Sequence, residues 1–234
     1  MIRTWESKFD KNYLAGDVPI SKIFRHNNQW EKLFELGNKD GFKILEIGSR
    51  EVTGKRKEFV RNNLSKATYI GFDFYSGDNV DVVGDVHKLS TYFKEDEKFD
   101  VIFTSACFEH FPMPWIAATE IAKILKVGGY LMIETHFSFS SHERPWHFFQ
   151  YSDMALRVLF SPALGFECIE AGMSNPIVGR FSSLADEYLR NRAVSGLYCH
   201  VEYLGKKIKE IKNFEWEKVD LTDVVGETKY PEPK

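Results

Sequence analysis

Short apolar blocks recur along the chain and are separated by segments whose apolar positions have helical spacing. Residues 42–47 form a partly β-branched apolar run that stops at Gly48, which favours a buried strand over a helix. Similar blocks predict strands at residues 67–73, 80–85, 99–104, 130–135, 166–170 and 197–204. The intervening segments predict helices at residues 54–64, at 154–160, and from 116 to the glycine pair 128–129. Strands that alternate with helices indicate βαβ units and a mostly parallel sheet.

Three segments lie outside this alternation. Residues 1–41 predict an N-terminal helical cap whose first helix is capped by Asp17, and the cap either packs on the edge of the sheet or covers the site as a lid. Residues 173–192 are interpreted as a partly helical insertion in a main domain that spans residues 42–207. Residues 208–234 form a charged tail that we expect to be peripheral.

Acidic residues end three successive predicted strands, at Glu46, Asp73 and Asp85. A carboxylate at the end of an otherwise buried strand is costly unless it is paired or solvated. Open α/β sheets bind ligands outside the carboxyl ends of their strands, and an acid at the end of the second strand suits the hydroxyls of a ribose. Gly48 lies just after Glu46, where glycine permits a positive φ or a close approach to a ligand. The pattern therefore predicts an adenosine-containing ligand.

The glycine spacing restricts which adenosine ligand fits. The dinucleotide fingerprint G-x-G-x-x-G is absent, because only Gly48 stands where three glycines are needed. The chain also has no G-x-x-x-x-G-K-[ST] loop for a nucleoside triphosphate. An adenosine ligand without phosphates remains, and a nicotinamide-dependent oxidoreductase is a disfavoured alternative.

Composition limits the class of protein, its possible partners and the compartment in which we expect it. The 234 residues suit one domain with decorations, and 43% apolar and 28% charged residues are ordinary globular usage. The net charge of −3 argues against a nucleic-acid partner. Cys107, Cys168 and Cys199 are too widely spaced for a disulfide framework and fit a reducing compartment. With no apolar signal region and no run long enough to span a membrane, we expect a soluble cytoplasmic protein.

The stretch from residue 136 to residue 151 breaks the alternation, because it is rich in both aromatic and imidazole side chains. His136, His142 and His147 lie there among phenylalanines, a tryptophan and a tyrosine, directly after a predicted strand. This position favours a wall of a substrate site, and the alternative is a hydrophobic plug at the end of the sheet. The histidine spacing matches no zinc pattern, so we expect no metal.

Taken together, these blocks resemble the class I S-adenosylmethionine-dependent methyltransferases, and in particular the type 11-like members, over residues 42–171. The resemblance rests on five segments in the family's order: residues 45–50, 69–73, 83–89, 99–111 and 124–131. It implies a Rossmann-like α/β fold with a mostly parallel seven-stranded sheet flanked by helices. It also implies methyl transfer from S-adenosylmethionine to a small-molecule or glycan acceptor, with oxygen as the expected methylated atom.

The resemblance assigns roles to residues at the predicted strand ends. It places Glu46 near the methionine amino group, Asp73 on the ribose and Asp85 on the adenine. The other cofactor contacts that it implies are Gly48, Ser49, Phe74, Val86, Ser105 and Ala106. Structural alternatives are a Glu46 carboxylate that accepts backbone N–H bonds and an Asp85 carboxylate that caps the next helix.

Methyl transfer needs positioning and exclusion of water, and it needs a base only if the acceptor carries a proton. Candidate bases are His110, His136 and His142, because imidazole titrates near neutral pH. Arg50 and Val52 occupy positions where the family usually has further glycines. This departure keeps a non-catalytic module that binds S-adenosylmethionine or S-adenosylhomocysteine as an alternative, and a homodimer also stays open.

Overall fold

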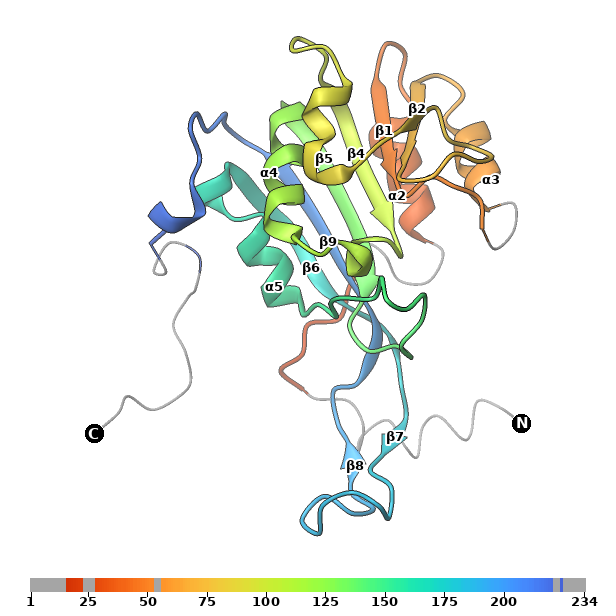
Figure 1. Ribbon diagram of the computed structural model, residues 1–234, viewed down its shortest axis with the longest axis vertical. Helices are drawn as coiled ribbons and strands as arrows, with labels where there is room; N and C mark the ends of the chain where they lie inside the picture. The colour runs from red at the N-terminus through yellow and green to blue at the C-terminus, as the bar shows by residue number, and fades with distance from the viewer. Residues whose placement is uncertain (1–15, 23–27, 53–55, 221–223, 225–234) are drawn as a thin grey trace.

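The computed structural model describes residues 16–22, 28–52, 56–220 and 224. Its centre is a seven-stranded sheet of order β3-β2-β1-β4-β5-β9-β6 (Figure 1). The strands are β1 (Lys43–Ile47), β2 (Thr68–Asp73), β3 (Val82–Val83), β4 (Phe99–Ser105), β5 (Leu125–His136), β6 (Phe166–Pro176) and β9 (Tyr198–Lys207). Only β9 runs antiparallel to its neighbours within this sheet, which confirms the predicted mostly parallel arrangement.

Helices cover both faces of the sheet. They are α2 (Asn28–Gly37), α3 (Arg56–Asn63), α4 (Pro114–Ile124) and α5 (Asp153–Leu159), with short 3-10 turns η1 (Val86–Tyr92), η2 (Phe108–His110), η3 (Pro162–Leu164) and η4 (Trp216–Lys218). Leu33 of α2 and Val60 of α3 pack on the face that carries Ile44 and Val101. The helices α4 and α5 pack on the opposite face in a second, larger cluster.

Side-chain alternation in β1 determines where its acid lies. Leu45 and Ile47 point into the α4–α5 cluster, whereas Ile44 points into the α2–α3 cluster. Glu46 is fully buried and, by the two-residue period of a strand, shares the face of Ile44. The first strand thus carries a carboxylate under the helical layer that includes α2.

The predicted helix before the glycine pair ends earlier than expected. α4 stops at Ile124, and Leu125 already has extended backbone angles of φ −80° and ψ 134°. β5 begins at Leu125 and pairs with Phe99 before the ladder shifts register between Phe99 and Val101. Apolar residues can serve a helix or a buried strand equally well, so the pattern alone did not locate this boundary.

The expected helix start at Asp17 is wrong. Residues 16–22 form a turn and then run beside the edge strand β6, where Ile20 makes a β-bridge with Met173. The Ser21 amide donates to the Met173 carbonyl at 2.9 Å, and the Met173 amide donates to the Pro19 carbonyl at 2.8 Å. Pairing with an exposed sheet edge satisfies these backbone groups without a helix. The rest of the predicted first helix, at residues 23–27, lies outside the described residues.

Two other expectations also need correction. Residues 173–192 contain no helix, because β6 continues to Pro176 and a small hairpin of β7 (Gly179–Arg180) and β8 (Ala193–Val194) extends from the sheet (Figure 1). The start of the tail is anchored, because Phe214 and Trp216 pack on the larger cluster and the Trp216 indole donates to the Trp115 carbonyl at 3.1 Å.

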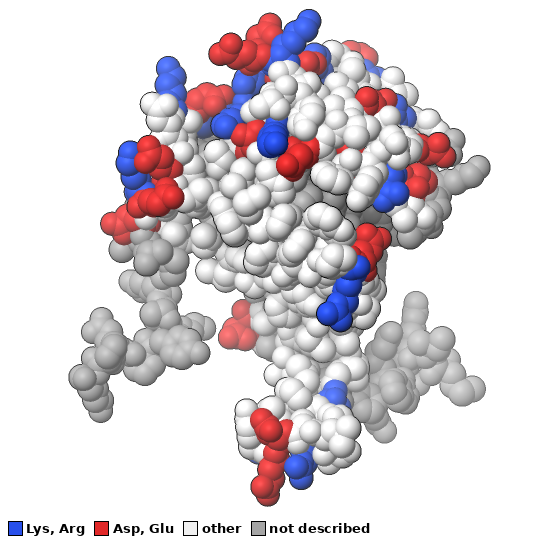
Figure 2. All heavy atoms as spheres, viewed as in Figure 1, with Lys and Arg blue, Asp and Glu red and all other residues white. Residues whose placement is uncertain are grey.

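Basic and acidic side chains are interspersed on the face of the molecule seen in Figure 2. No helix in the described part of the chain has the length and apolar character needed to cross a membrane.

Candidate active site

The strand register brings the turns after β1, β2, β4 and β5 to one edge of the sheet. Ile47 at the end of β1 lies opposite Phe72 of β2 and Thr104 of β4. Ser105 at the end of β4 lies opposite Glu134 of β5. The sequence-predicted site residues that follow these strands are therefore neighbours, as parallel strands require.

The turn after β1 needs its glycine. Gly48 has a φ of +80°, and a Cβ atom placed there would lie only 2.5 Å from Sγ of Cys107. The amides of Gly48 and Ser49 both donate to the Phe72 carbonyl, at 2.9 and 3.1 Å. The turn is thus held between the end of β2 and the segment after β4.

Glu46 supports this turn from beneath. The Tyr69 hydroxyl donates to Oε2 of Glu46, and the Asn79 amide donates to the Tyr69 oxygen and to the Ser49 carbonyl, each at 3.0 Å. Burial and the Glu46 carboxylate raise the pKa of Tyr69, so its hydroxyl keeps the proton that it donates. The Tyr69 phenol is thus one partner of this buried carboxylate.

Asp73 lies at the end of β2 and is mostly buried, with 14% of its side chain exposed. Its oxygens accept hydrogen bonds from the Arg50 amide at 3.1 Å and the Tyr75 amide at 3.0 Å. Nε of Arg50 is 3.7 Å from Oδ1, and the guanidinium lies over the Tyr75 ring. A carboxylate offers about four acceptor positions, so two amides leave capacity for ribose hydroxyls. The neighbouring Phe74 is exposed.

Asp85 follows β3 on the same edge, because β3 pairs with β2 and the Gly84 amide donates to the Asp73 carbonyl at 2.9 Å. Its Oδ1 accepts from the His87 amide at 2.9 Å and lies 2.6 Å from Nδ1 of His87. Burial acts to raise the pKa of Asp85, but the hydrogen bonds from His87 lower it overall. Asp85 therefore caps η1, and Val86 beside it is buried in the core.

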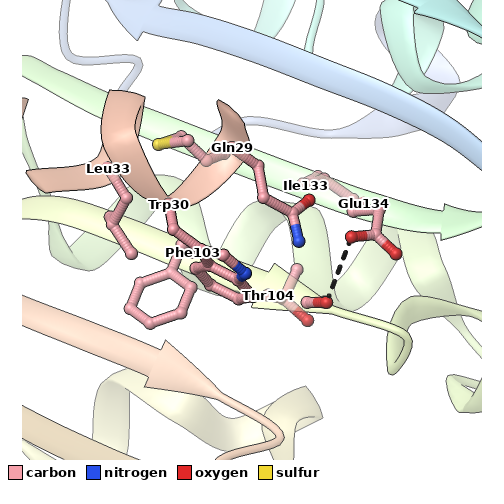
Figure 3. Close-up of a pocket in the computed structure, with 9 residues that line it drawn as sticks. Gln29, Trp30, Leu33, Phe103, Thr104, Ile133 and Glu134 are labelled. Atoms are coloured by element: carbon pink, nitrogen blue, oxygen red, sulfur yellow. Dashed lines mark hydrogen bonds between the residues drawn. The ribbon is translucent and has the colours of Figure 1, made fainter. Parts of the chain in front are cut away.

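A pocket lies between α2 and the sheet at the ends of β4 and β5 (Figure 3). Its lining residues are Gln29, Trp30, Leu33, Phe103, Thr104, Ser105, Met132, Ile133 and Glu134. The Ser105 hydroxyl donates to Oε2 of Glu134 at 3.3 Å, and the Ala106 amide donates to the Glu134 carbonyl at 3.0 Å. α2 thus packs on the face of the sheet, not on its edge, and also covers the space beside Ser105.

Glu202 of β9 lies opposite Glu134 of β5 on the same face. It is buried, the Ser174 hydroxyl donates to its Oε1, and its Oε2 has no hydrogen-bond partner among the described residues. Burial raises the pKa of Glu202 to about 7, and the nearby Glu134 charge acts in the same direction. This carboxyl therefore takes up a proton at a pH where an exposed glutamate is ionised.

The three candidate bases meet around Glu109, which is fully buried. Oε1 of Glu109 is 2.8 Å from Nδ1 of His136 and 3.9 Å from Nε2 of His110. The His142 ring centroid is 5.0 Å from that of His110 and 5.2 Å from that of His136. Burial acts to raise the pKa of Glu109, but His136 and a hydrogen bond from Thr135 lower it overall, so Glu109 supplies a negative charge among the imidazoles.

The aromatic loop, residues 137–151, is fastened to this cluster through its backbone. The Phe148 and Phe149 amides both donate to the Glu109 carbonyl, at 3.0 and 3.2 Å. Phe139 stacks on His136 with a centroid separation of 4.5 Å. Phe139, Trp146 and Phe148 remain 47%, 50% and 42% exposed, which favours a wall that faces solvent over a hydrophobic plug.

Several residues at this edge escaped the sequence analysis. Glu109 was not among the candidate site residues, although the Glu109-His110 pair shortly after β4 was the available signal. His200 lies opposite His136 in the β5–β9 ladder, with its Nε2 3.5 Å from Glu134. Its placement follows from strand order, which a single sequence does not reveal. Tyr69 was a strand residue with no evident partner until the fold placed it beside Glu46.

The fold and the chain match known methyltransferases. A family model described as "Methyltransferase domain" matches residues 24–163, so the chain belongs to this family of enzymes. The predicted Rossmann-like methyltransferase fold is confirmed by solved structures. The YcgJ protein of Bacillus subtilis has 16% identity and a TM-score of 0.54, with 80% of this chain and 100% of that chain covered.

Two further structures have the same fold. A putative methyltransferase of Bacillus halodurans has 15% identity and a TM-score of 0.56, with 78% of this chain and 100% of that chain covered. A protein of Archaeoglobus fulgidus described as a SAM dependent methyltransferase has 16% identity and a TM-score of 0.54, with 88% and 99% covered. Identities this low speak for the fold alone. A comparison with curated proteins finds no match.

Proposed function

We propose that the protein transfers a methyl group from S-adenosylmethionine to an oxygen atom of a small-molecule or glycan acceptor. The observation that carries this proposal is the pair Asp73 and Asp85 at the ends of adjacent strands, beside a glycine turn without a diphosphate cradle. Membership in a methyltransferase family supports the reaction class.

The residues present fit the cofactor. Asp73 would accept hydrogen bonds from the ribose hydroxyls, and Asp85 would accept one from the adenine amino group while it caps η1. The adenine would lie near Phe74 and in front of the buried Val86. When bound, S-adenosylmethionine supplies a methyl group on a positively charged sulfur.

The methionine end of the cofactor would contact the turn that Gly48 and Ser49 form, with Ser105 and Ala106 across from it at the end of β4. We assign Glu46 the task of holding the turn through Tyr69, in addition to the contact with the methionine amino group that the resemblance implies.

The imidazole cluster supports an acceptor that carries a proton, as a hydroxyl does. His110 is the best placed base, because its Nδ1 lies 2.7 Å from the Trp146 carbonyl and must donate to it. This fixes the tautomer and leaves a lone pair on Nε2, which faces the Glu109 side. Nε2 of His110 can therefore take the acceptor proton. His136 and His142 remain the further base candidates.

The exposed rings of the aromatic loop suit a flat or sugar-like acceptor. Trp146 lies 6.3 Å from Phe74 between ring centroids, so aromatic surface runs from the cofactor side to the imidazole cluster. Aromatic faces bind other rings and the C–H faces of sugars with little loss of side-chain entropy.

Residues 42–207 form the proposed catalytic domain, residues 1–41 the N-terminal cap and residues 208–234 the tail. We propose the cytoplasm as its location, because Cys107, Cys168 and Cys199 form no disulfide in the described part of the chain.

Thermal melts with S-adenosylhomocysteine and with NAD test the cofactor. A ligand at a hundred times its dissociation constant stabilises the folded state by about 2.7 kcal/mol. For a chain of this size the melting temperature should rise by roughly 5–10 °C. A shift with NAD and none with S-adenosylhomocysteine would overturn the proposal in favour of an oxidoreductase. Binding of S-adenosylhomocysteine without transfer of labelled methyl to any hydroxylated acceptor in a broad screen would favour the non-catalytic module.

A further inference from the structure

We propose that Glu109, His136 and His142 bind a divalent first-row transition-metal ion, which in turn holds the hydroxyl oxygen of the acceptor. One ligand atom from each of the three residues lies within 4.8 Å of the other two. The ligands come from η2, from the end of β5 and from the aromatic loop. Glu109 is distant in the sequence from the two histidines and meets them only because the ends of β4 and β5 are neighbours, which explains why no metal motif was visible in the sequence.

The contact between Glu109 and His136 has the geometry of two ligands rather than of a hydrogen-bonded pair. Oε1 and Nδ1 are 2.8 Å apart and both atoms are buried, yet neither makes a well-aligned hydrogen bond within the described part of the chain. Neighbouring ligand atoms in an octahedral site with bonds of about 2.1 Å lie about 3 Å apart. Two buried polar atoms at this separation are therefore placed to face a common third position.

Hydrogen bonds to groups outside the cluster leave one ring nitrogen of His142 and one carboxylate oxygen of Glu109 available to bind a metal ion. Nδ1 of His142 is 3.0 Å from the Ser140 carbonyl, which can only accept, so Nε2 of His142 carries the lone pair. The Thr135 hydroxyl donates to Oε2 of Glu109 at 2.7 Å and leaves Oε1 available. Metal-binding histidines commonly donate their second ring N–H to a carbonyl, and metal-binding carboxylates are themselves hydrogen-bonded.

The donor set selects the kind of ion. Two imidazole nitrogens and one carboxylate oxygen suit Zn²⁺, Mn²⁺, Fe²⁺, Co²⁺ or Ni²⁺, whereas Mg²⁺ and Ca²⁺ favour oxygen ligands throughout. Three protein ligands also leave coordination positions open, as in catalytic sites. A purely structural site would close these positions with further side chains.

The role of the ion rests on the proposed methyl transfer. A hydroxyl bound to a divalent metal ion loses its proton more readily than a free hydroxyl. The acceptor oxygen gives that proton to Nε2 of His110 and forms a bond to the methyl carbon, while the carbon–sulfur bond breaks and the sulfonium becomes a thioether. The acceptor is therefore a hydroxylated molecule that can bind a metal ion through the oxygen that is methylated.

Calorimetric titration of ZnCl₂ into the tag-free, full-length protein after chelator treatment tests the site. We expect one ion per chain, and no comparable binding of Mg²⁺. His142→Ala should lower the Zn²⁺ affinity at least tenfold, and Glu109→Gln should do the same. His142 is only half-buried, so its removal should leave the fold intact even if the change at buried Glu109 does not. His87→Gln is the matched control, because His87 pairs with Asp85 outside the cluster and its loss should leave the affinity for Zn²⁺ unchanged.

Absence of stoichiometric Zn²⁺ binding, or equal affinity in the wild type and in a folded His142→Ala variant, would overturn the metal site. S-adenosylhomocysteine binding, measured on the same preparations, separates this outcome from a failure of the proposed function. If the protein binds S-adenosylhomocysteine but not Zn²⁺, only the metal site is wrong. If it binds Zn²⁺ but not S-adenosylhomocysteine, the metal site holds and the proposed cofactor is wrong.

Discussion

Replacement of Gly48 by alanine should both destabilise the protein and damage cofactor binding. The residue has a φ of +80°, and an alanine there is strained by roughly 1–2 kcal/mol. The new Cβ would also lie 2.5 Å from Sγ and 2.8 Å from Cβ of Cys107, and overpacking of this kind costs roughly 1–3 kcal/mol. The free energy of unfolding should therefore fall by about 2–5 kcal/mol.

The clash can be separated from the backbone strain by a double-mutant cycle in urea unfolding. Cys107→Gly removes both atoms that the new Cβ would meet, so Gly48→Ala should cost only the strain, roughly 1–2 kcal/mol, in that background. The S-adenosylhomocysteine affinity of each folded variant gives the functional effect. If Gly48→Ala alone costs under about 0.5 kcal/mol, or costs the same with and without Cys107, this account of the turn is wrong.

Three further substitutions test other parts of the edge. Asp73→Ala should weaken S-adenosylhomocysteine binding, measured by calorimetry, at least a hundredfold. The reason is that hydrogen bonds to a charged group contribute about 1.5–3 kcal/mol each. An unchanged affinity would remove Asp73 from the site. Tyr69→Phe removes a hydrogen-bond donor to buried Glu46 and should lower the free energy of unfolding by about 1–3 kcal/mol. No change in chemical denaturation would contradict the role of the Tyr69 hydroxyl in supporting the turn after β1. The pKa of Glu202 is raised from about 4.5 when unfolded to about 7 when folded, so its contribution to stability falls as the pH rises through this window and stays low above it. Glu202→Gln should therefore stabilise the protein by roughly 3 kcal/mol at pH 8 and hardly at all at pH 4, and equal effects at both pH values would refute the shift.

The sheet could be predicted from the sequence because each strand carries its own signal. Residues 42–47 and 99–104 are short apolar runs that no amphipathic helix would produce, and both became central strands. The boundary between α4 and β5 could not be located, because Leu125 is equally suitable for either element. Asp17 is a good helix cap in isolation. The backbone of residues 19–21 instead forms hydrogen bonds with the edge strand β6, which is incompatible with a helix there.

Some features of the candidate site could likewise be predicted from the sequence, and others could not. The common placement of Glu46, Asp73 and Asp85 could be predicted because each lies at or next to the end of a strand, and these strand ends gather at one edge. The partnership of Glu109 with His136 depends on the side-by-side placement of β4 and β5 and on the rotamers of two buried side chains. No local pattern encodes such a contact, so it became visible only with the fold.

The two hydrogen bonds from Phe148 and Phe149 to the Glu109 carbonyl tie the outer loop to the backbone of the imidazole cluster. Any outward movement of the loop that admits a bulky molecule must break these two hydrogen bonds or move η2 together with the loop. Movement of the loop is then coupled to the geometry of the inner side chains, so the proposed catalytic arrangement would form only when the loop is in the position seen in this structure. Amide hydrogen exchange at Phe148 and Phe149 would report directly on how often that happens.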